Sequence, residues 1–300
     1  ADTYLIKSKG TSGYEEVLEF YFDARSFVAI SELYSEQYTT IIKREKSELI
    51  IKIFCIDPSK NIKYILNKSY SNIIFSATLL PMKYYIDLLG GDENSYRMRL
   101  DSPFNKENLM IYVSDLDMRY NFRDKNIEKL CKIINKFVNE VKGNYMIFFP
   151  SFEYSKKVYK QYILKYGDEN LMFHDEGLRE KEKEEFLASF TEEGSIIAFT
   201  VVGGIFSEGI DLPGKKLIGA IIVGVGFPMV SDENNIIGEY FGRFGFEYAY
   251  IFPGINRVLQ AVGRVIRTES DKGRVLLIDS RYIQERYRKI LPSQWEFNLI

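Results

Sequence analysis

The chain has 300 residues, of which 46% are hydrophobic and 27% charged; 40 Lys and Arg face 42 Asp and Glu, giving a formal net charge of −2. This balance excludes a disordered tail, a collagen-like fibre and a small disulfide-rich scaffold. One large or two ordinary domains are expected at this length. No apolar run reaches about 18 residues, so we expect no transmembrane helix, and the polar start argues against a signal peptide. We therefore expect a cytoplasmic protein with no membrane partner.

Candidate metal ligands are scarce. Cys55 and Cys131 are the only cysteines and His174 the only histidine. Two distant thiols fit a reducing compartment and cannot hold a four-thiolate cluster within this chain. We expect both thiols to be buried, and we expect His174 to lie in a loop or at the surface. The sequence predicts no metal site in this chain.

The first third of the chain is weakly patterned. Apolar positions at helical spacing predict an amphipathic helix over residues 14–33. Residues 49–55 and 73–75 are strand candidates, and the second runs directly into Ser76-Ala-Thr-Leu-Leu-Pro81. The Gly90-Gly91 pair and the polar stretch to Pro103 form the best internal boundary.

Strands and helices alternate after that boundary. The pattern predicts strands and helices at these positions: strands 109–113, 145–149, 195–199, 217–223 and 275–278; helices 126–141, 152 onward, within 175–193, and 255–266. Nearly continuous apolar strands separated by helices indicate an α/β fold, a parallel sheet with helices on both faces. In such sheets ligands gather where the strands end, so functional residues are sought in the loops that follow strands.

Gln260-Ala-Val-Gly-Arg-Val-Ile-Arg267 carries the strongest chemistry. On a helix, Gln260, Arg264 and Arg267 would share one face. Two guanidinium groups projecting together repel each other unless an anion lies opposite, and their planar forks fit phosphate oxygens. Gly263 allows another backbone or a nucleotide to approach. The alternative is a solvated basic face paired with Glu269 and Asp271.

Gly203-Gly-Ile-Phe-Ser-Glu-Gly-Ile-Asp211 follows the strand predicted at 195–199. Its glycines, Gly203, Gly204 and Gly209, permit unusual backbone angles and expose N–H groups that can hold phosphate. Glu208 and Asp211 could accept hydrogen bonds from a ribose or a metal-bound water. The alternative is an ordinary turn with two capping carboxylates.

Two shorter segments also follow predicted strands. The hydroxyls of Ser76 and Thr78 could couple a catalytic carboxylate to a neighbouring domain, or cap the helix after Pro81. Ser151, after the strand at 145–149, could contact a nucleic-acid phosphate.

Together, in this order and spacing, these segments resemble the C-terminal part of superfamily 2 DNA helicases of the XPD/DinG group. The resemblance covers roughly residues 48–295. Ser76-Ala-Thr-Leu-Leu-Pro81 looks like motif III, Phe149-Pro-Ser-Phe152 the motif IV region, Gly203-Gly-Ile-Phe-Ser-Glu-Gly-Ile-Asp211 motif V, and Gln260-Ala-Val-Gly-Arg-Val-Ile-Arg267 motif VI. Such helicases hold ATP and Mg²⁺ between two RecA-like domains.

The resemblance implies a role for each motif residue. Arg264 and Arg267 would be arginine fingers on the γ-phosphate, and Gln260 would orient one of them or contact the nucleotide. Gly204, Glu208, Gly209, Asp211 and Gly263 would form the nucleotide side of the site. Ser151, Thr200 and Gly203 would contact single-stranded or forked DNA, and Ser76 and Thr78 would couple hydrolysis to movement. Residues 239–290 hold ten Lys and Arg against six Asp and Glu, compatible with a phosphate-tracking groove.

Other helicase elements are missing from the sequence. It contains neither the phosphate-binding pattern Gly-x-x-x-x-Gly-Lys-Ser/Thr nor an acidic metal-holding box. By the resemblance, residues 1–46 are the tail of an arch-like insertion, 47–95 the end of the first motor domain, and 96–300 the second motor domain. The first motor domain, with an iron–sulfur cluster where one is present, would lie upstream, so this chain alone would not hydrolyse ATP.

The leading hypothesis is the C-terminal motor portion of an ATP-dependent DNA helicase acting in DNA repair. The alternative is a non-catalytic nucleic-acid-binding or partner-docking module that keeps the fold. The retention of both Arg264 and Arg267 favours the motor. A dinucleotide-dependent oxidoreductase fails, because Gly224-Val-Gly226 lacks the third glycine of the fingerprint.

Overall fold

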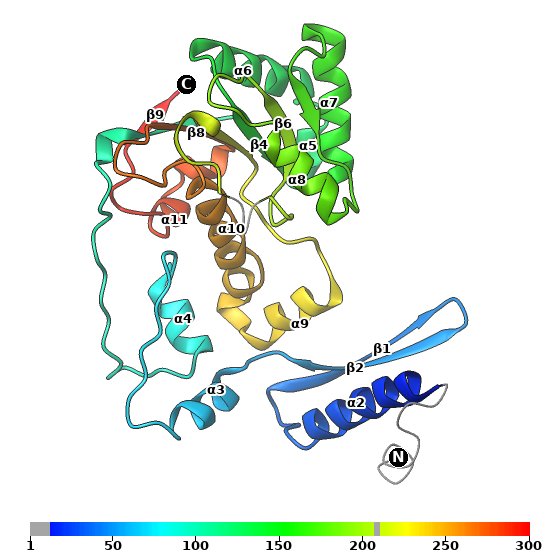
Figure 1. Ribbon diagram of the computed structural model, residues 1–300. Coiled ribbons are helices and arrows are strands. Elements are labelled where there is room, and N and C mark those ends of the chain that lie inside the picture. The colour runs from blue at the N-terminus through cyan, green and yellow to red at the C-terminus, as the bar shows by residue number, and fades with distance from the viewer. Residues whose placement is uncertain (1–12, 207–210) are drawn as a thin grey trace.

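Parallel strands form the centre of the molecule. The computed structural model describes residues 13–206 and 211–300 (Figure 1). Seven of its strands belong to the central sheet: β3 (Leu109–Ser114), β4 (Tyr145–Phe149), β5 (Leu171–Phe173), β6 (Ile197–Val201), β7 (Gly219–Val223), β8 (Gly273–Ile278) and β9 (Phe297–Leu299). Their order is β5-β6-β4-β7-β8-β3-β9, and every pairing is parallel. The predicted sheet is confirmed, with β5 and β9 as strands that periodicity had not indicated.

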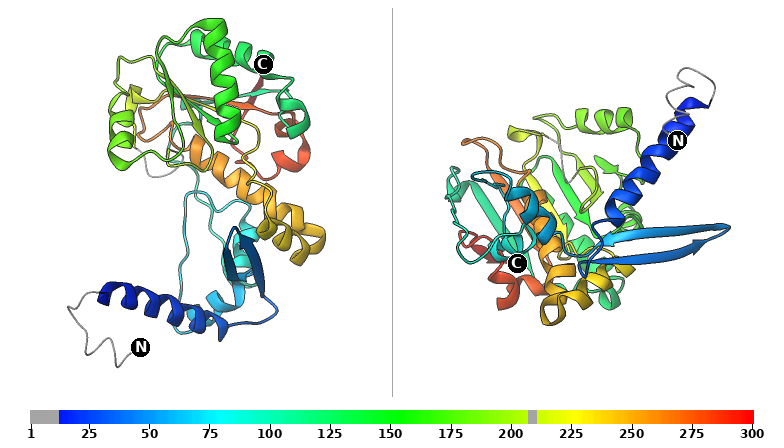
Figure 2. Two further views of the ribbon diagram at one scale, coloured as in Figure 1. Left: turned by 90° about the vertical axis from the view of Figure 1, so that its right-hand side faces the viewer. Right: turned by 90° about the horizontal axis from the view of Figure 1, so that it is seen from below.

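Helices connect these strands and cover both faces of the sheet (Figure 2). They are α5 (Tyr120–Arg123), α6 (Ile127–Glu140), α7 (Phe152–Tyr166), α8 (Glu180–Ala188), α9 (Asp232–Tyr240), α10 (Phe252–Val262) and α11 (Glu285–Arg288). Shorter turns are η1 (Lys106–Asn108), η2 (Gly214–Lys216), η3 (Gly242–Phe244), η4 (Glu247–Ile251) and η5 (Ser280–Ile283). The bounds confirm the predicted helices at 126–141, from 152 and within 175–193.

Two apolar clusters, one on each face, hold these layers together. Helices α6 and α7 pack on one face, burying among others Leu130, Phe137 and Val158. Helices α8 and α10 pack on the other, with Phe186 and Val258 in its core. Alternation along β4 supplies both clusters, since Phe148 faces one and Phe149 the other. Burial on both faces explains why the strands read as unbroken apolar runs.

The N-terminal part lies beside α9 and α10, away from the central sheet (Figures 1 and 2). Its elements are α2 (Tyr14–Ser31), β1 (Tyr38–Glu45), β2 (Glu48–Cys55), α3 (Ser59–Leu66) and α4 (Met82–Leu88). Strands β1 and β2 form a separate antiparallel hairpin. The hairpin contacts α9 through Lys43–Asp232 and Lys52–Glu233, with N–O distances of 3.1 and 3.4 Å.

The N-terminal part differs from the sequence prediction at residues 73–75 and at the proposed boundary after residue 46. The strand predicted at 73–75 is wrong: these residues lie in irregular chain, with Ile73 86% and Phe75 87% exposed. A strand requires a ladder partner, and the described part of the chain offers none there. The boundary proposed between residues 46 and 47 falls at the turn of the β1–β2 hairpin, so the strands on its two sides form one unit.

Candidate functional site

Several loops meet at one edge of the sheet. Because all seven strands are parallel, their carboxyl ends lie on the same side. Ser151 follows β4, Gly203 follows β6, Gly224 follows β7 and Asp279 follows β8. These four strands are β6-β4-β7-β8 in the sheet order, so the loops are consecutive neighbours along this edge. The candidate site is built on that edge.

The motif V loop begins immediately after β6. The Val202 N–H donates to the carbonyl oxygen of Phe149 at 2.8 Å, which holds the loop to the end of β4. Gly203 is exposed and adopts φ 73°, a left-handed conformation that disfavours residues with a side chain. At Gly204 a Cβ atom would lie 2.7 Å from Cγ2 of Val201, so a larger residue would not fit without movement. Glu208 and Gly209 lie outside the described residues.

Thr200 and Ser151, both predicted to contact DNA, differ in how accessible their hydroxyls are. Thr200 is fully buried in β6, and its hydroxyl donates to the carbonyl oxygen of Ile147 at 3.0 Å. Its prediction as a DNA-contacting residue is therefore wrong for the side chain, because a buried, satisfied hydroxyl cannot reach a strand. Ser151 is half-buried and caps α7, accepting from the N–H of Tyr154 at 3.3 Å. Because Ser151 lies at the carboxyl end of β4, it is still a candidate for a DNA contact.

Motif VI does not form the single helical face that its spacing predicted. Helix α10 ends at Val262, with exposed Gly263 as its C-cap, so Arg264 and Arg267 lie in the following turn. The physical reason is Asp271. Its carboxylate accepts the N–H groups of Arg267 and Thr268, both at 2.8 Å, and the Thr268 hydroxyl at 2.6 Å. These amides are satisfied without a continued helix.

The same contacts set the charge of Asp271. Its burial alone would raise the pKa. Hydrogen bonds from the Thr268 hydroxyl and from the N–H groups of Arg267 and Thr268 outweigh that effect and hold the pKa below its usual value. The carboxylate is thus ionised at neutral pH and fixes the backbone that carries Arg267.

Motifs V and VI meet at Asp211 and Arg267. The Nε atom of Arg267 lies 3.6 Å from Oδ1 of Asp211, and their side chains are 32% and 76% exposed. The contact is long and its carboxylate is exposed, so this pair by itself contributes about 1 kcal/mol or less. The sequence prediction that the two motifs form one site is consistent with this contact. Gln260 is half-buried in the last turn of α10.

The motif III segment is followed by α4, which contacts η4 and α10. Ser76 is exposed and its hydroxyl accepts from the N–H of Thr78 at 3.4 Å, so the two predicted coupling residues contact each other. Four residues after Thr78, α4 begins, and its Tyr84 ring packs on Tyr248 and Phe252, with centroids 5.2 Å apart in each pair. The hydroxyl of Tyr248 also donates to Asp87 of α4. The coupling role of Ser76 and Thr78 stays a prediction.

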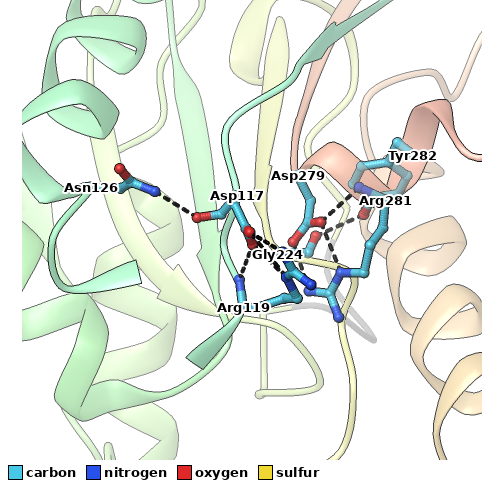
Figure 3. A network of polar contacts seen from close by, with 7 residues as sticks. All are labelled: Asp117, Arg119, Asn126, Gly224, Asp279, Arg281 and Tyr282. Carbon is cyan, nitrogen blue, oxygen red and sulfur yellow. Dashed lines mark hydrogen bonds and ion pairs between the residues drawn. The ribbon is translucent and has the colours of Figure 1, made fainter. Parts of the chain in front are cut away.

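Motif reasoning missed a charged network at the same edge (Figure 3). Asp279 is fully buried and accepts from Nε and Nη2 of Arg281 at 2.8 and 2.7 Å. The Tyr282 hydroxyl donates to the carbonyl oxygen of Gly224 at 2.8 Å, joining the loops after β7 and β8. The signal was present in the sequence, since Asp279 directly follows a predicted strand.

Asp117 and Arg119 form the outer pair of this network (Figure 3). Nε of Arg119 lies 3.0 Å from both carboxylate oxygens of Asp117. The hydrogen bonds from Arg119 hold the pKa of Asp117 below its usual value, and the charge of Arg281 adds to the effect. The two pairs therefore influence each other electrostatically.

His174 lies in the loop after β5, as expected, but it is buried there and not at the surface. It is 3% exposed and sits among the rings of Phe152, Phe186 and Phe206, at centroid distances of 5.1, 6.4 and 4.7 Å. Apolar neighbours disfavour the charged imidazolium, so burial lowers the pKa of His174, while Asp175 opposes the shift. His174 therefore packs directly against Phe206 of the motif V loop.

Within the described ranges, no group of three or more His, Cys, Asp or Glu side chains is arranged to hold a metal ion. No described helix is both long and apolar enough to span a bilayer. Cys131 is buried as expected, which raises the pKa of its thiol to about 11, and Cys55 is partly buried.

The parallel sheet, the helices on both faces and the two motifs joined at its carboxyl edge define a RecA-like helicase motor domain. The chain belongs to the helicase C-terminal domain family, whose model matches residues 134–298. The resemblance to the C-terminal part of XPD/DinG-group superfamily 2 helicases is confirmed by the relatives described next.

Curated relatives and solved structures agree with this assignment. A probable ATP-dependent helicase of Methanocaldococcus jannaschii is 28% identical over 89% of this chain and 46% of its own length. The ATP-dependent DNA helicase XPD of Sulfolobus acidocaldarius is 25% identical over 77% of this chain and 43% of its own. A solved apo XPD structure superimposes with a TM-score of 0.69 at 20% identity, covering 100% of this chain and 60% of that one. The chain thus spans about half the length of the curated relatives it matches.

Proposed function

We propose that this chain is the C-terminal motor portion of an ATP-dependent DNA helicase. The observation that carries the proposal is the contact between Asp211 and Arg267, which joins motif V to motif VI at the carboxyl edge of the sheet. Family membership over residues 134–298 supports it. The full-length protein would couple ATP hydrolysis to translocation along single-stranded DNA and to unwinding of forked duplex, in the cytoplasm and in the service of DNA repair.

On the nucleotide side, we assign Arg264 and Arg267 the role of arginine fingers. Charge developing on the transferred phosphoryl oxygens would be stabilised by their guanidinium groups, and Gln260 would orient them. Asp211 would hold Arg267 until phosphate arrives. Gly204, Glu208, Gly209 and Gly263 would line the nucleotide. ATP and Mg²⁺ would be shared with a first motor domain encoded upstream, where an iron–sulfur cluster is also proposed.

On the DNA side, we assign contacts to Ser151 and Gly203. Both lie in loops after neighbouring strands, β4 and β6. Residues 96–300 would form the second motor domain, and residues 47–95 would complete the first, with 1–46 as the tail of an arch-like insertion. In that division, Ser76 and Thr78 would transmit hydrolysis to movement through the α4 contact with Tyr248 and Phe252.

The test compares the isolated chain with the full-length protein. The chain alone should hydrolyse no ATP with or without single-stranded DNA, because it contains no phosphate-binding loop. The full-length protein should show DNA-stimulated hydrolysis, and Arg264→Ala should abolish it by removing transition-state stabilisation of several kcal/mol. Single-strand affinity, measured by fluorescence anisotropy, should remain largely intact.

Two results would contradict the proposal. DNA-stimulated hydrolysis by the purified 300-residue chain would show that the upstream domain is not needed. Full hydrolysis by the Arg264→Ala variant would remove the arginine-finger role. DNA binding by a full-length protein with no ATPase activity would instead favour the non-catalytic binding module.

A further inference from the structure

Arg257 lies against the motif V loop. It is on α10, one turn after Gly254. A Cβ atom added to Gly203 would lie 3.2 Å from Nε, 3.3 Å from Cδ and 3.4 Å from Cζ of Arg257. The end of the Arg257 side chain therefore fills the space that a side chain at position 203 would occupy. Motif V thus meets α10 at Gly203 and Arg257, and meets motif VI at Asp211 and Arg267.

Close backbone packing fixes this position of α10. A Cβ on Gly226 would lie 2.6 Å from the carbonyl oxygen of Gly254, and one on Gly254 would lie 2.8 Å from that of Val225. The helix therefore packs tightly on the loop after β7 at Gly254 and reaches the loop after β6 at Arg257. In the sheet order β4 lies between β6 and β7, so the two loops that α10 contacts flank the loop after β4. Arg257 is placed by the fold rather than by a mobile loop.

Half of the cations in residues 239–290 are paired with carboxylates of the described residues. The five paired cations are Arg267, Arg274, Arg281, Arg286 and Lys289. Arg257 is different. It is half-buried, and no carboxylate of residues 13–206 or 211–300 lies within ion-pair distance of it. Holding a partly desolvated charge without a counterion costs free energy, which an anion at this position would recover.

We propose that Arg257 binds a phosphate group of the single-stranded DNA backbone, beside the exposed residue Gly203. The planar guanidinium fork suits a phosphodiester, and backbone contacts of this kind carry affinity without reading sequence. The assignment rests on the proposed helicase function. It adds a cation for the DNA phosphate beside motif V, which itself contains no Lys or Arg. The strand is favoured over the nucleotide because Arg257 adjoins Gly203, whereas Arg264 and Arg267 follow the end of α10.

The test uses the full-length protein and measures the affinity for a fluorescent oligothymidine by anisotropy at several salt concentrations. Arg257→Gln retains the length of the side chain beside Gly203 and removes its charge, and Arg257→Lys retains the charge. The Gln variant should bind about tenfold more weakly, as for one lost charge-assisted hydrogen bond. Its slope of log K against log salt should fall by about 0.7, the value for one phosphate contact on a single strand. The Lys variant should keep the slope.

Lys142→Gln is the matched control, since Lys142 is exposed and precedes β4, at the amino edge of the sheet opposite the candidate site. It should leave both affinity and slope unchanged. An unchanged slope in Arg257→Gln would overturn the assignment, even if affinity fell, because lost packing does not change counterion release. Weaker binding of ATP alone, with normal DNA binding, would overturn it in favour of a nucleotide phosphate. A wild-type protein that binds no single-stranded DNA would refute the proposed function and this assignment together.

Discussion

Asp279→Ala removes the acceptor at the centre of the network in Figure 3. The side chain of Asp279 is 0% exposed and that of Arg281 is 15% exposed. The carboxylate accepts three hydrogen bonds from Arg281: from its backbone N–H at 2.9 Å, Nε at 2.8 Å and Nη2 at 2.7 Å. Alanine leaves the guanidinium mostly buried and without this partner.

Losing one partner of a buried ion pair costs about 3–5 kcal/mol. We expect the lower end of that range, about 3 kcal/mol, because Asp117 still offers a negative charge to Arg281. Since domains unfold with about 5–15 kcal/mol in total, this is a large share of the stability. A second substitution, Arg281→Met, should restore part of the loss in the Asp279→Ala background, because it removes the uncompensated charge while retaining apolar contact with Phe227.

The assay is urea unfolding of the 300-residue chain, followed by far-ultraviolet circular dichroism and by the fluorescence of Trp295, which packs on the core. Asp117→Ala is the matched control, because the Asp117–Arg119 pair is 23% and 58% exposed and should contribute about 1 kcal/mol or less. The reasoning is refuted if Asp279→Ala costs no more than this control. It is also refuted if the double variant is less stable than Asp279→Ala alone.

Two further predictions concern pH. The pKa of Asp271 is lowered in the folded chain, so its contribution to stability is present at neutral pH and is lost as the pH falls below about 4, the pKa of an aspartate in the unfolded chain. The urea midpoint of Asp271→Asn should therefore fall less steeply in acid than that of the wild type. Equal slopes of the urea midpoint against pH would contradict this. Burial lowers the pKa of His174 from its ordinary 6.5, so protonation favours the unfolded state and stability should drop as the pH falls below 6.5. His174→Phe should flatten the urea midpoint between pH 7 and 5, and an unchanged pH profile would rule out His174 as the cause.

The sequence predicted the parallel sheet well because burial on both faces leaves continuous apolar strands such as β4 and β7. It failed at residues 73–75, because an apolar run becomes a strand only when another strand lies beside it. Motif spacing brought Asp211 and Arg267 to one site. It could not show that α10 ends before Arg264 or that Asp271 holds the backbone of Arg267 and Thr268, since the second depends on a carboxylate returning from a later position.

The buried residues of the site were harder to predict than its motifs. Thr200 was predicted to contact DNA, but in β6 its hydroxyl donates to the carbonyl oxygen of Ile147. The lone His174 reads as a loop residue because it precedes Asp175, yet the rings of α8 and of the motif V loop enclose it. Burial depends on which elements pack together, and local sequence carries little of that information.

Two kinds of arginine–aspartate pair lie on the carboxyl edge of this sheet, and their difference bears on the motor. Asp279 and Arg281 are buried with short bidentate contacts, so exchanging one partner would be costly and the pair serves to fix the loop after β8. Asp211 is exposed and Arg267 half-buried, and the 3.6 Å between their charged atoms is longer than the contacts of the first pair, so theirs is the weaker interaction. The proposed role of Arg267 as one of two arginine fingers requires it to leave Asp211 for phosphate in every cycle. Their longer, more exposed contact suits that exchange better than the buried pair, whose Arg281 suits a scaffold.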